Sequence, residues 1–297
     1  MGSILQERVG GKTGFPSSGI LPITKSLQFT EHGFPKFNWN DVATDGYNGW
    51  IFPGKGEAYP TCGTFHVVGC LTHNPGYFKR IKDTCDRAEC PDDYKIWLVR
   101  STKYITKRIK VGEPNRYRKP IHVTVSPGKD AWSKFDSLDG YRKTRRKAIR
   151  IAKKAGMIGG ALIFHPYRDT GTIKDPKWYF SPHFHILGYG WIVQTATIYD
   201  KTGWIVKNHR VRKSIGATAY YQLSHAGVKT RHHVISWFGA LSTRALKVER
   251  DKNEEFETCP MCDSRLKRVI YYGTGDNPMS DPEIVEKYLD TNYWKYR

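Results

Sequence analysis

Two histidines, His183 and His185, stand one residue apart in a segment with the composition of a β-strand, residues 178–190. Alternate side chains of a strand project to the same face, so the two imidazoles would lie side by side while Phe184 and Ile186 point to the opposite face. Two imidazoles at that separation can hold one divalent ion. The pair alone is equally compatible with ordinary strand histidines, so the case for a metal depends on a second motif.

The second motif is a short stretch between Gly216 and Gly227 that has the pattern of a helix. Tyr221 and His225 are four residues apart in it and would share one face. A tyrosine phenol held beside a metal ion is a nucleophile suited to attack on phosphorus. Tyr220 would project about 100° away from Tyr221, so only one of the two tyrosines can face the ion.

A third imidazole would complete the metal site, and two histidines compete for that place. His225 has the four-residue relation to Tyr221 in its favour, and we expect it to be the third ligand. The competitor is His165, in an apolar run at residues 161–168 that predicts a strand paired antiparallel with residues 178–190. Whichever histidine does not bind the ion would pack in the core or support a ligand.

Three motifs occur in a fixed order along the chain. They are Ile121-His-Val-Thr-Val-Ser-Pro127, the His-Phe-His strand with Pro182 and Gly188-Tyr-Gly190, and Tyr221-Gln-Leu-Ser-His-Ala followed by Trp237-Phe-Gly-Ala-Leu-Ser242. In this order they resemble the HUH endonucleases, and more closely the rolling-circle replication initiators (Rep proteins) of archaeal plasmids and viruses. The resemblance covers about residues 60–265.

The resemblance implies an activity and a fold. Tyr221 would nick single-stranded origin DNA, including DNA folded as a hairpin, leaving a 5′-phosphotyrosine bond and a free 3′-hydroxyl, and would later rejoin the strand. His183, His185 and the third ligand would hold Mg²⁺ or Mn²⁺. A host helicase and polymerase would be partners. The fold would be α+β: a central antiparallel sheet of about five strands with helices on one face (RRM-like), and zinc-binding appendages.

Charge and composition favour a nucleic-acid partner. The 297 residues include 48 Lys and Arg against 28 Asp and Glu, a formal net charge of +20, and 13% aromatic residues that could stack on bases. We expect DNA contacts from a basic helix at residues 138–155 and from cations just ahead of the tyrosine helix, although such runs are often only solvated faces. The candidates are Arg142, Arg145, Arg146, Lys207, Arg210, Arg212 and Lys213.

The cysteines predict structural zinc, because thiolates are good zinc ligands and an intracellular setting disfavours disulfides. Our expected ligand set is Cys70, His73, Cys85 and Cys90, with Cys62 as a competitor. A second pair, Cys259 and Cys262, has the tight Cys-x2-Cys spacing but lacks a nearby partner pair. It either recruits ligands from the cysteines at residues 62–90, with Cys62 and Cys70 as the expected companions, or holds a metal with other partners.

We divide the chain into an irregular extension (1–60), a cysteine-rich zinc-binding segment (61–95), the catalytic core (96–250) and a C-terminal segment with the Cys-x2-Cys pair (251–297). Residues 192–198 and 203–206 predict a hairpin. The segment Gly10–Thr13 lacks the first glycine of a phosphate-binding loop, which argues against an NTPase. The chain has neither a bilayer-length apolar run nor a signal peptide, so we expect a cytoplasmic protein with no membrane partner.

Two rival functions remain open at this stage. One is a transposase or relaxase that uses the same kind of site on single-stranded DNA. The other is a non-catalytic, zinc-containing nucleic-acid-binding protein in which the histidines are structural and Tyr221 only packs in the core. Charge and cysteines would look alike in all of these proteins, and the role of the tyrosine discriminates between them.

Overall fold

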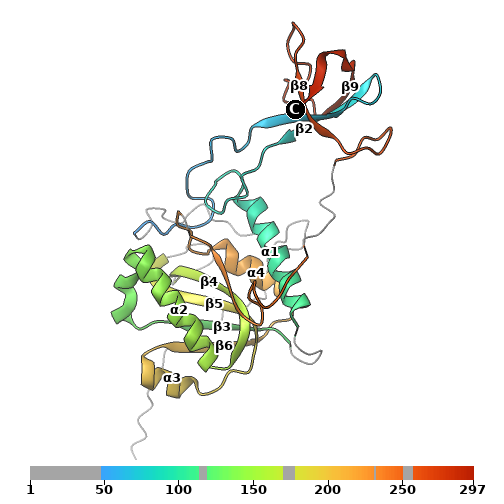
Figure 1. Ribbon diagram of the computed structural model, residues 1–297. Coiled ribbons are helices and arrows are strands. Elements are labelled where there is room, and N and C mark those ends of the chain that lie inside the picture. The colour runs from blue at the N-terminus through green and yellow to red at the C-terminus, as the bar shows by residue number, and fades with distance from the viewer. Residues whose placement is uncertain (1–47, 114–118, 170–177, 231, 250–256) are drawn as a thin grey trace, which may run out of the picture. The chain divides into compact units, whose positions relative to one another are not determined.

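The computed structural model describes residues 48–113, 119–169, 178–230, 232–249 and 257–297 (Figure 1). Most of the predicted extension, including Gly10–Thr13, lies outside these residues. The described chain is α+β, with two antiparallel five-stranded sheets. No helix within it has the length and apolar character needed to cross a bilayer.

The first sheet carries the predicted histidine strand at its centre. Its strand order is β6 (Ile205–Val211), β3 (Ile121–Ser126), β5 (Trp178–Gly190), β4 (Met157–Asp169) and β7 (Ile235–Gly239). The antiparallel register places His165 of β4 opposite His183, and Thr124 of β3 opposite His185. The expected central antiparallel sheet and the expected pairing of the two long strands are therefore both confirmed.

Helices cover both faces of this sheet, so the expectation of helices on one face is wrong. One face packs its core, which includes Phe164 and Phe184, against α2 (Leu138–Lys154), α3 (Thr195–Thr202) and the 3₁₀ helix η1 (Lys129–Asp136). The other face packs against α1 (Tyr94–Val111) and α4 (Ile215–Ser224). The reason is in β5, where Phe184 and Ile186 alternate with Leu187 and Tyr189, so that both faces are apolar beyond the histidines and both need cover.

The predicted hairpin at 192–206 is also wrong, because residues 195–202 form helix α3. The β-branched composition of this stretch favoured strands. Gly203 ends the helix at a positive φ of 67°, and Ile198 is buried in the core beneath it. Only the second half of the expected hairpin is a strand, β6.

The second sheet combines strands from the predicted 61–95 and 251–297 segments. Its order is β10 (Trp294–Tyr296), β8 (Lys267–Tyr271), β1 (Phe65–Cys70), β2 (Gly76–Lys82) and β9 (Glu286–Leu289), with the 3₁₀ helix η2 at Thr291–Tyr293. Phe78 and Trp294 pack against each other at 4.5 Å between ring centroids, beside Val269 and Met279. Two segments far apart in sequence therefore share one core.

The last part of the predicted extension belongs to the first core. Trp50 is fully buried, and its Nε1–H donates to the carbonyl oxygen of Phe135 at 3.0 Å. The neighbouring Ile51 pairs as an isolated bridge with Val228, just beyond α4. This segment braces the region that follows the tyrosine helix.

We predict that Phe164→Ala lowers the free energy of unfolding by about 3–5 kcal/mol, because the change leaves a cavity in a close-packed core. The ring of Phe164 is fully buried and stacks on Phe135 at 5.1 Å between centroids. Urea denaturation measures the change. The control is Tyr199→Ala on α3, whose side chain is 54% exposed, and an equal loss in both variants would contradict the assignment of this core.

Candidate metal centre and tyrosine site

Three histidines of the first sheet form a cluster that could hold a metal ion. They are His165 of β4 with His183 and His185 of β5, and one ring nitrogen of each lies within 4.8 Å of the others. The alternation of β5 brings two of them together, and the antiparallel pairing with β4 adds the third. His165 and His183 are only 1% and 3% exposed, so the cluster is held by the sheet itself.

Backbone carbonyls orient two of these imidazoles. Nδ1 of His183 lies 2.7 Å from the carbonyl oxygen of Ser181, and Nε2 of His165 lies 2.8 Å from that of Gln222. Since a carbonyl only accepts, each of these ring nitrogens carries the proton and the other nitrogen keeps its lone pair. This is the arrangement by which proteins orient histidine ligands for a metal, so these two residues fit the role.

His185 is oriented by a chain of side chains. Nδ1 of His185 lies 2.7 Å from Nε2 of His122, whose Nδ1 accepts a hydrogen bond from Arg212 at 2.8 Å. The ring of His209 stacks on His122 at 4.5 Å. His122 and His209 were not predicted for the site. The sequence contained an indication of His122, because this histidine lies in the strand of the first motif, Ile121–Pro127. It shares a strand face with Thr124, the residue opposite His185.

Burial keeps the cluster neutral. Desolvation, followed by the fields of nearby histidines and of Arg168, holds the pKa of His165, His183 and His185 well below the usual value of 6.5. A neutral imidazole is the form that binds a metal ion. At neutral pH the three side chains are therefore uncharged, as metal ligands must be.

The expected third ligand, His225, lies outside the three-histidine cluster, whereas the competitor, His165, belongs to it. The grouping favours His165 over His225 as the third ligand of an ion. Helix α4 ends at Ser224, and His225 is its C-cap with non-helical angles, so the helical relation that favoured it does not continue to this residue. Its ring lies 4.3 Å from that of His165 and 4.6 Å from that of Tyr221, between centroids.

The two tyrosines have different surroundings, as the helical spacing predicts. Tyr220 packs against the apolar core shared by α1 and α4. Tyr221 is 41% exposed and contacts His225. Desolvation, and next the carboxylate of Asp169, raise the pKa of Tyr221 above the usual 10, so its phenol is protonated at neutral pH. Ser214 begins the helix by accepting a hydrogen bond from the backbone N–H of Ala217 at 3.1 Å.

The predicted basic residues divide between the two sides of the sheet. Arg142, Arg145 and Arg146 belong to α2, which packs on the face opposite the histidines. Lys207 lies directly opposite Thr124 and so shares the histidine face, and Arg212 contacts His122. Arg210 and Lys213 are exposed in the same segment.

Sequence reasoning missed one cation of this region, Arg168 of β4. Its guanidinium donates to the hydroxyls of Ser181 and Ser126 at 3.1 and 3.0 Å. Desolvation lowers the pKa of both Arg168 and Arg212. Both guanidiniums thus stand half-buried on neutral partners in these contacts, a setting that favours an incoming anion.

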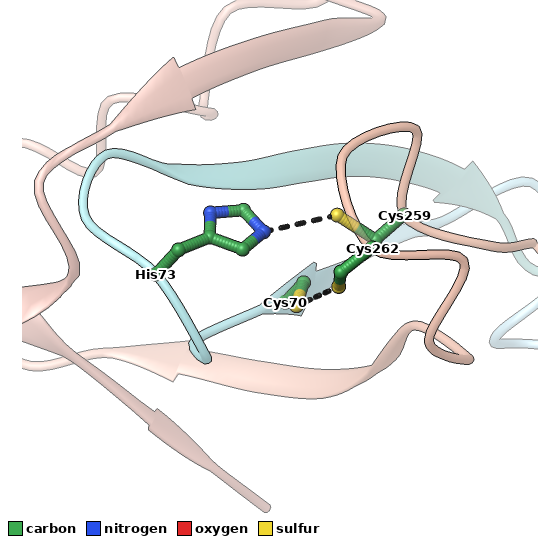
Figure 2. Close-up of side chains that lie close together, drawn as sticks. All are labelled: Cys70, His73, Cys259 and Cys262. Atoms are coloured by element: carbon green, nitrogen blue, oxygen red, sulfur yellow. Dashed lines mark hydrogen bonds between the residues drawn. The ribbon is translucent and has the colours of Figure 1, made fainter.

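The first cysteine cluster joins the two cysteine-bearing parts of the chain. Figure 2 shows Cys70 and His73, at the turn of the β1–β2 hairpin, facing Cys259 and Cys262. The Sγ atoms of Cys70 and Cys262 are 3.7 Å apart, and Nε2 of His73 is 3.2 Å from Sγ of Cys259. Tetrahedral zinc with bonds of about 2.3 Å to sulfur requires sulfur atoms about 3.8 Å apart. The four side chains could therefore hold one zinc ion.

The second cluster contains the remaining cysteines, Cys62, Cys85 and Cys90. The Sγ atoms of Cys62 and Cys90 are 3.5 Å apart. The expected set of Cys70, His73, Cys85 and Cys90 is therefore corrected, because its members are divided between two clusters. The strands of the β1–β2 hairpin cause the division, since six residues of strand separate the turn from the open end by about 20 Å.

Comparisons with known proteins add no relative to this picture. No protein family, curated protein or solved structure matches the chain.

We predict that Mn²⁺ binds the three-histidine cluster and raises the melting temperature by about 5 °C at a concentration near 100 times its dissociation constant. Mn²⁺ is the probe because thiolate sites filled with zinc do not exchange with it readily. Differential scanning fluorimetry should show the shift in the parent chain and in His233→Ala, which changes an exposed histidine. His183→Ala should melt lower and lose the shift. A full shift in His183→Ala would remove this residue from the site.

We predict that Cys262 reacts with iodoacetamide faster than Cys62 in the zinc-free protein at pH 7. Hydrogen bonds from the side chain and backbone of Ser264 lower the pKa of Cys262 to about 6, so the reactive thiolate prevails above that pH. The hydrogen bond to Asp93, and then burial, raise the pKa of Cys62. Alkylation followed by peptide mass spectrometry should show the Cys262 rate rising between about pH 5 and pH 7 and falling when zinc is added.

Equal alkylation rates for the two thiols at pH 7 would contradict the lowered pKa of Cys262. A Cys262 rate that zinc does not change would contradict its place in the zinc-binding cluster.

Proposed function

We propose that this protein is a metal-dependent endonuclease of the HUH type that nicks and rejoins single-stranded DNA through Tyr221, as replication initiators do in rolling-circle replication. The observation that carries the proposal is the arrangement of Tyr221 against His225 and of His225 against the three-histidine cluster, with ring centroids 4.6 and 4.3 Å apart. A tyrosine nucleophile, a metal-competent cluster and nearby cations are the parts that phosphodiester cleavage needs.

The ion would be held by His165, His183 and His185. When bound, Mg²⁺ or Mn²⁺ supplies a Lewis acid that polarises a phosphate oxygen of the scissile group. Tyr221 supplies the nucleophile: its phenol oxygen forms the bond to phosphorus, the bond from phosphorus to the 3′ oxygen breaks, and the phenol proton is lost as the 3′-hydroxyl gains one. Because the pKa of Tyr221 is raised, its deprotonation accompanies binding or attack.

The positive charge around the site supports a nucleic-acid substrate. Arg168 and Arg212 donate to neutral groups beside the histidines, and Lys207 lies on the same sheet face. The whole chain has a formal net charge of +20. Phosphates of a bound strand would relieve the mutual repulsion of these cations. We place the reaction in the cytoplasm of a host cell, where a helicase would unwind the duplex and a polymerase would extend the free 3′-hydroxyl.

We predict that the protein forms a covalent adduct with single-stranded oligonucleotides in Mn²⁺, seen as a slower band on a denaturing gel. Labelled oligonucleotides that cover candidate origins, some of them with hairpins, are the substrates. Tyr221→Phe should lose the adduct by at least about 10³-fold, because the nucleophile is gone. Tyr220→Phe is the matched control and should retain it. His183→Ala and EDTA should also abolish it.

The outcomes distinguish the rival functions. Loss of the adduct in Tyr220→Phe instead of Tyr221→Phe would exchange the roles of the two tyrosines. DNA binding without cleavage or adduct under any metal would favour a zinc-containing binding protein. Cleavage and rejoining between two separate ends, with no extension of the 3′-hydroxyl by polymerase, would favour a transposase or relaxase.

A further inference from the structure

Asp93 is a buried carboxylate whose bonding is incomplete. Its side chain is fully buried, and Oδ2 lies 2.9 Å from Sγ of Cys62 and 2.5 Å from the backbone N–H of Cys85. Its other oxygen, Oδ1, is buried and has no hydrogen-bond partner within the described residues. Leaving a carboxylate oxygen unsatisfied in the interior is costly. A group that binds this oxygen would remove that cost.

Capping of helix α1 does not explain where the side chain of Asp93 lies. It is the N-cap residue of α1, but its side chain caps no backbone N–H of that helix. Its backbone carbonyl accepts the first helical bond, from Trp97, at 3.0 Å. The carboxylate turns instead toward the cysteines, where the contact with Sγ of Cys62 is its side-chain partner.

The cysteines near Asp93 form a group of three that could hold a zinc ion but lacks a fourth ligand. The Asp93 carboxylate touches this group at Cys62 without being a member of it. Cys62, Cys85 and Cys90 lie within mutual ligand distance, and structural zinc in proteins takes four ligands. Cys90 and Asp93 are three residues apart, the same spacing as in the Cys-x2-Cys turn that zinc sites use. Sγ of Cys62 connects the two halves, at 3.5 Å from Cys90 and 2.9 Å from Asp93.

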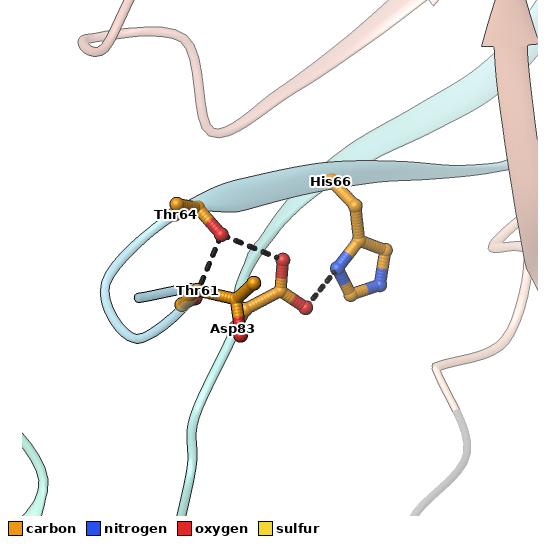
Figure 3. A network of polar contacts seen from close by, with 4 residues as sticks. All are labelled: Thr61, Thr64, His66 and Asp83. Carbon is orange, nitrogen blue, oxygen red and sulfur yellow. Dashed lines mark hydrogen bonds and ion pairs between the residues drawn. The ribbon is translucent and has the colours of Figure 1, made fainter. Parts of the chain in front are cut away.

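The backbone near the cluster is held firmly enough to present these ligands. The open end of the β1–β2 hairpin lies between Cys62 and Cys85. Figure 3 shows Asp83 there, accepting a hydrogen bond from Thr64 at 3.1 Å and pairing with His66 at 2.8 Å. The N–H of Tyr94 donates to the carbonyl of Cys90 at 2.9 Å and fixes the start of α1.

We propose that Cys62, Cys85, Cys90 and Asp93 form a second structural zinc site, in which Asp93 is the fourth ligand. Binding replaces the three thiol protons by Zn²⁺, so the Cys62 thiol no longer donates to the carboxylate. Oδ2 keeps the N–H of Cys85 as its donor, and Oδ1 is the oxygen available to the ion. With four protein ligands the site is closed and has no open position for a substrate. The ion would tie the chain just before β1 and just after β2 to the start of α1.

Native mass spectrometry of the full chain, purified with zinc, tests this assignment. We expect two zinc ions per chain in the parent and in Asp92→Ala, which changes the exposed neighbouring carboxylate. Asp93→Ala and Cys62→Ala should each retain one. Asp93→Cys should hold two, because a thiolate is a zinc ligand, whereas a carboxylate needed only for hydrogen bonding would not be replaced by cysteine.

Cobalt substitution provides a second readout that a purely structural role would not change. The two clusters supply six thiolates in the parent chain, so the thiolate-to-cobalt absorption should rise by about one-sixth in Asp93→Cys. The proposal is overturned if Asp93→Ala keeps two zinc ions with the parent's resistance to chelators, or if the parent holds only one. If Asp93→Ala is insoluble, a soluble Asp93→Cys with one zinc ion or unchanged cobalt absorption also overturns it.

Discussion

The buried hydrogen bond between Nε2 of His165 and the carbonyl oxygen of Gln222 joins the sheet to the tyrosine helix at 2.8 Å. The next residues repeat the connection, since the N–H of Gly227 donates to the carbonyl of Phe164 at 2.7 Å. A Cβ at Gly227 would lie 2.7 Å from Cδ of Pro166, so a larger residue would push the two elements apart. The distance from Tyr221 to the histidines therefore depends on close packing at the end of α4.

The protein separates its candidate metal sites by ligand chemistry. The first sheet offers three imidazoles, whereas the two cysteine clusters offer mainly thiolates. Thiolates select zinc, and imidazoles accept a wider range of divalent ions. The thiolate clusters could tie together segments of chain around the second sheet, and the imidazole cluster lies beside His225, which contacts the partly exposed Tyr221.

The periodicity of the sequence was sufficient to predict which histidines of the two long strands come together. It was insufficient to predict the residues around them. The alternation of His183 and His185, the adjacent strand with His165 and the separation of Tyr221 from Tyr220 all follow from local geometry. The four-residue spacing did bring His225 against Tyr221, but the helix ends at Ser224 and His225 lies outside the three-histidine cluster, which the sequence did not indicate. The preferred grouping of the cysteines does not occur, whereas the alternative in which Cys259 and Cys262 recruit Cys70 matches the cluster, with His73 in place of Cys62. The sequence could not decide between the two, because Cys70 and Cys259 meet only through pairing of strands nearly two hundred residues apart. Nothing in the sequence indicated Asp93 as a candidate zinc ligand, because a lone aspartate at a helix start usually caps the helix.

The hydrogen-bonded series of side chains from Arg212 through His122 to His185 determines which ring nitrogens carry protons. Arginine only donates, so Nδ1 of His122 is an acceptor, Nε2 of a neutral His122 carries the proton, and Nδ1 of His185 accepts it. The remaining proton of a neutral His185 is then on Nε2, the nitrogen that would have to be bare for a metal. Ligation through that nitrogen requires His185 to change tautomer, which reverses the bond to His122 and leaves Nδ1 of His122 protonated and facing Arg212. Two donors cannot share that contact, so an ion held by Nε2 of His185 would be incompatible with the Arg212–His122 bond and would release the guanidinium.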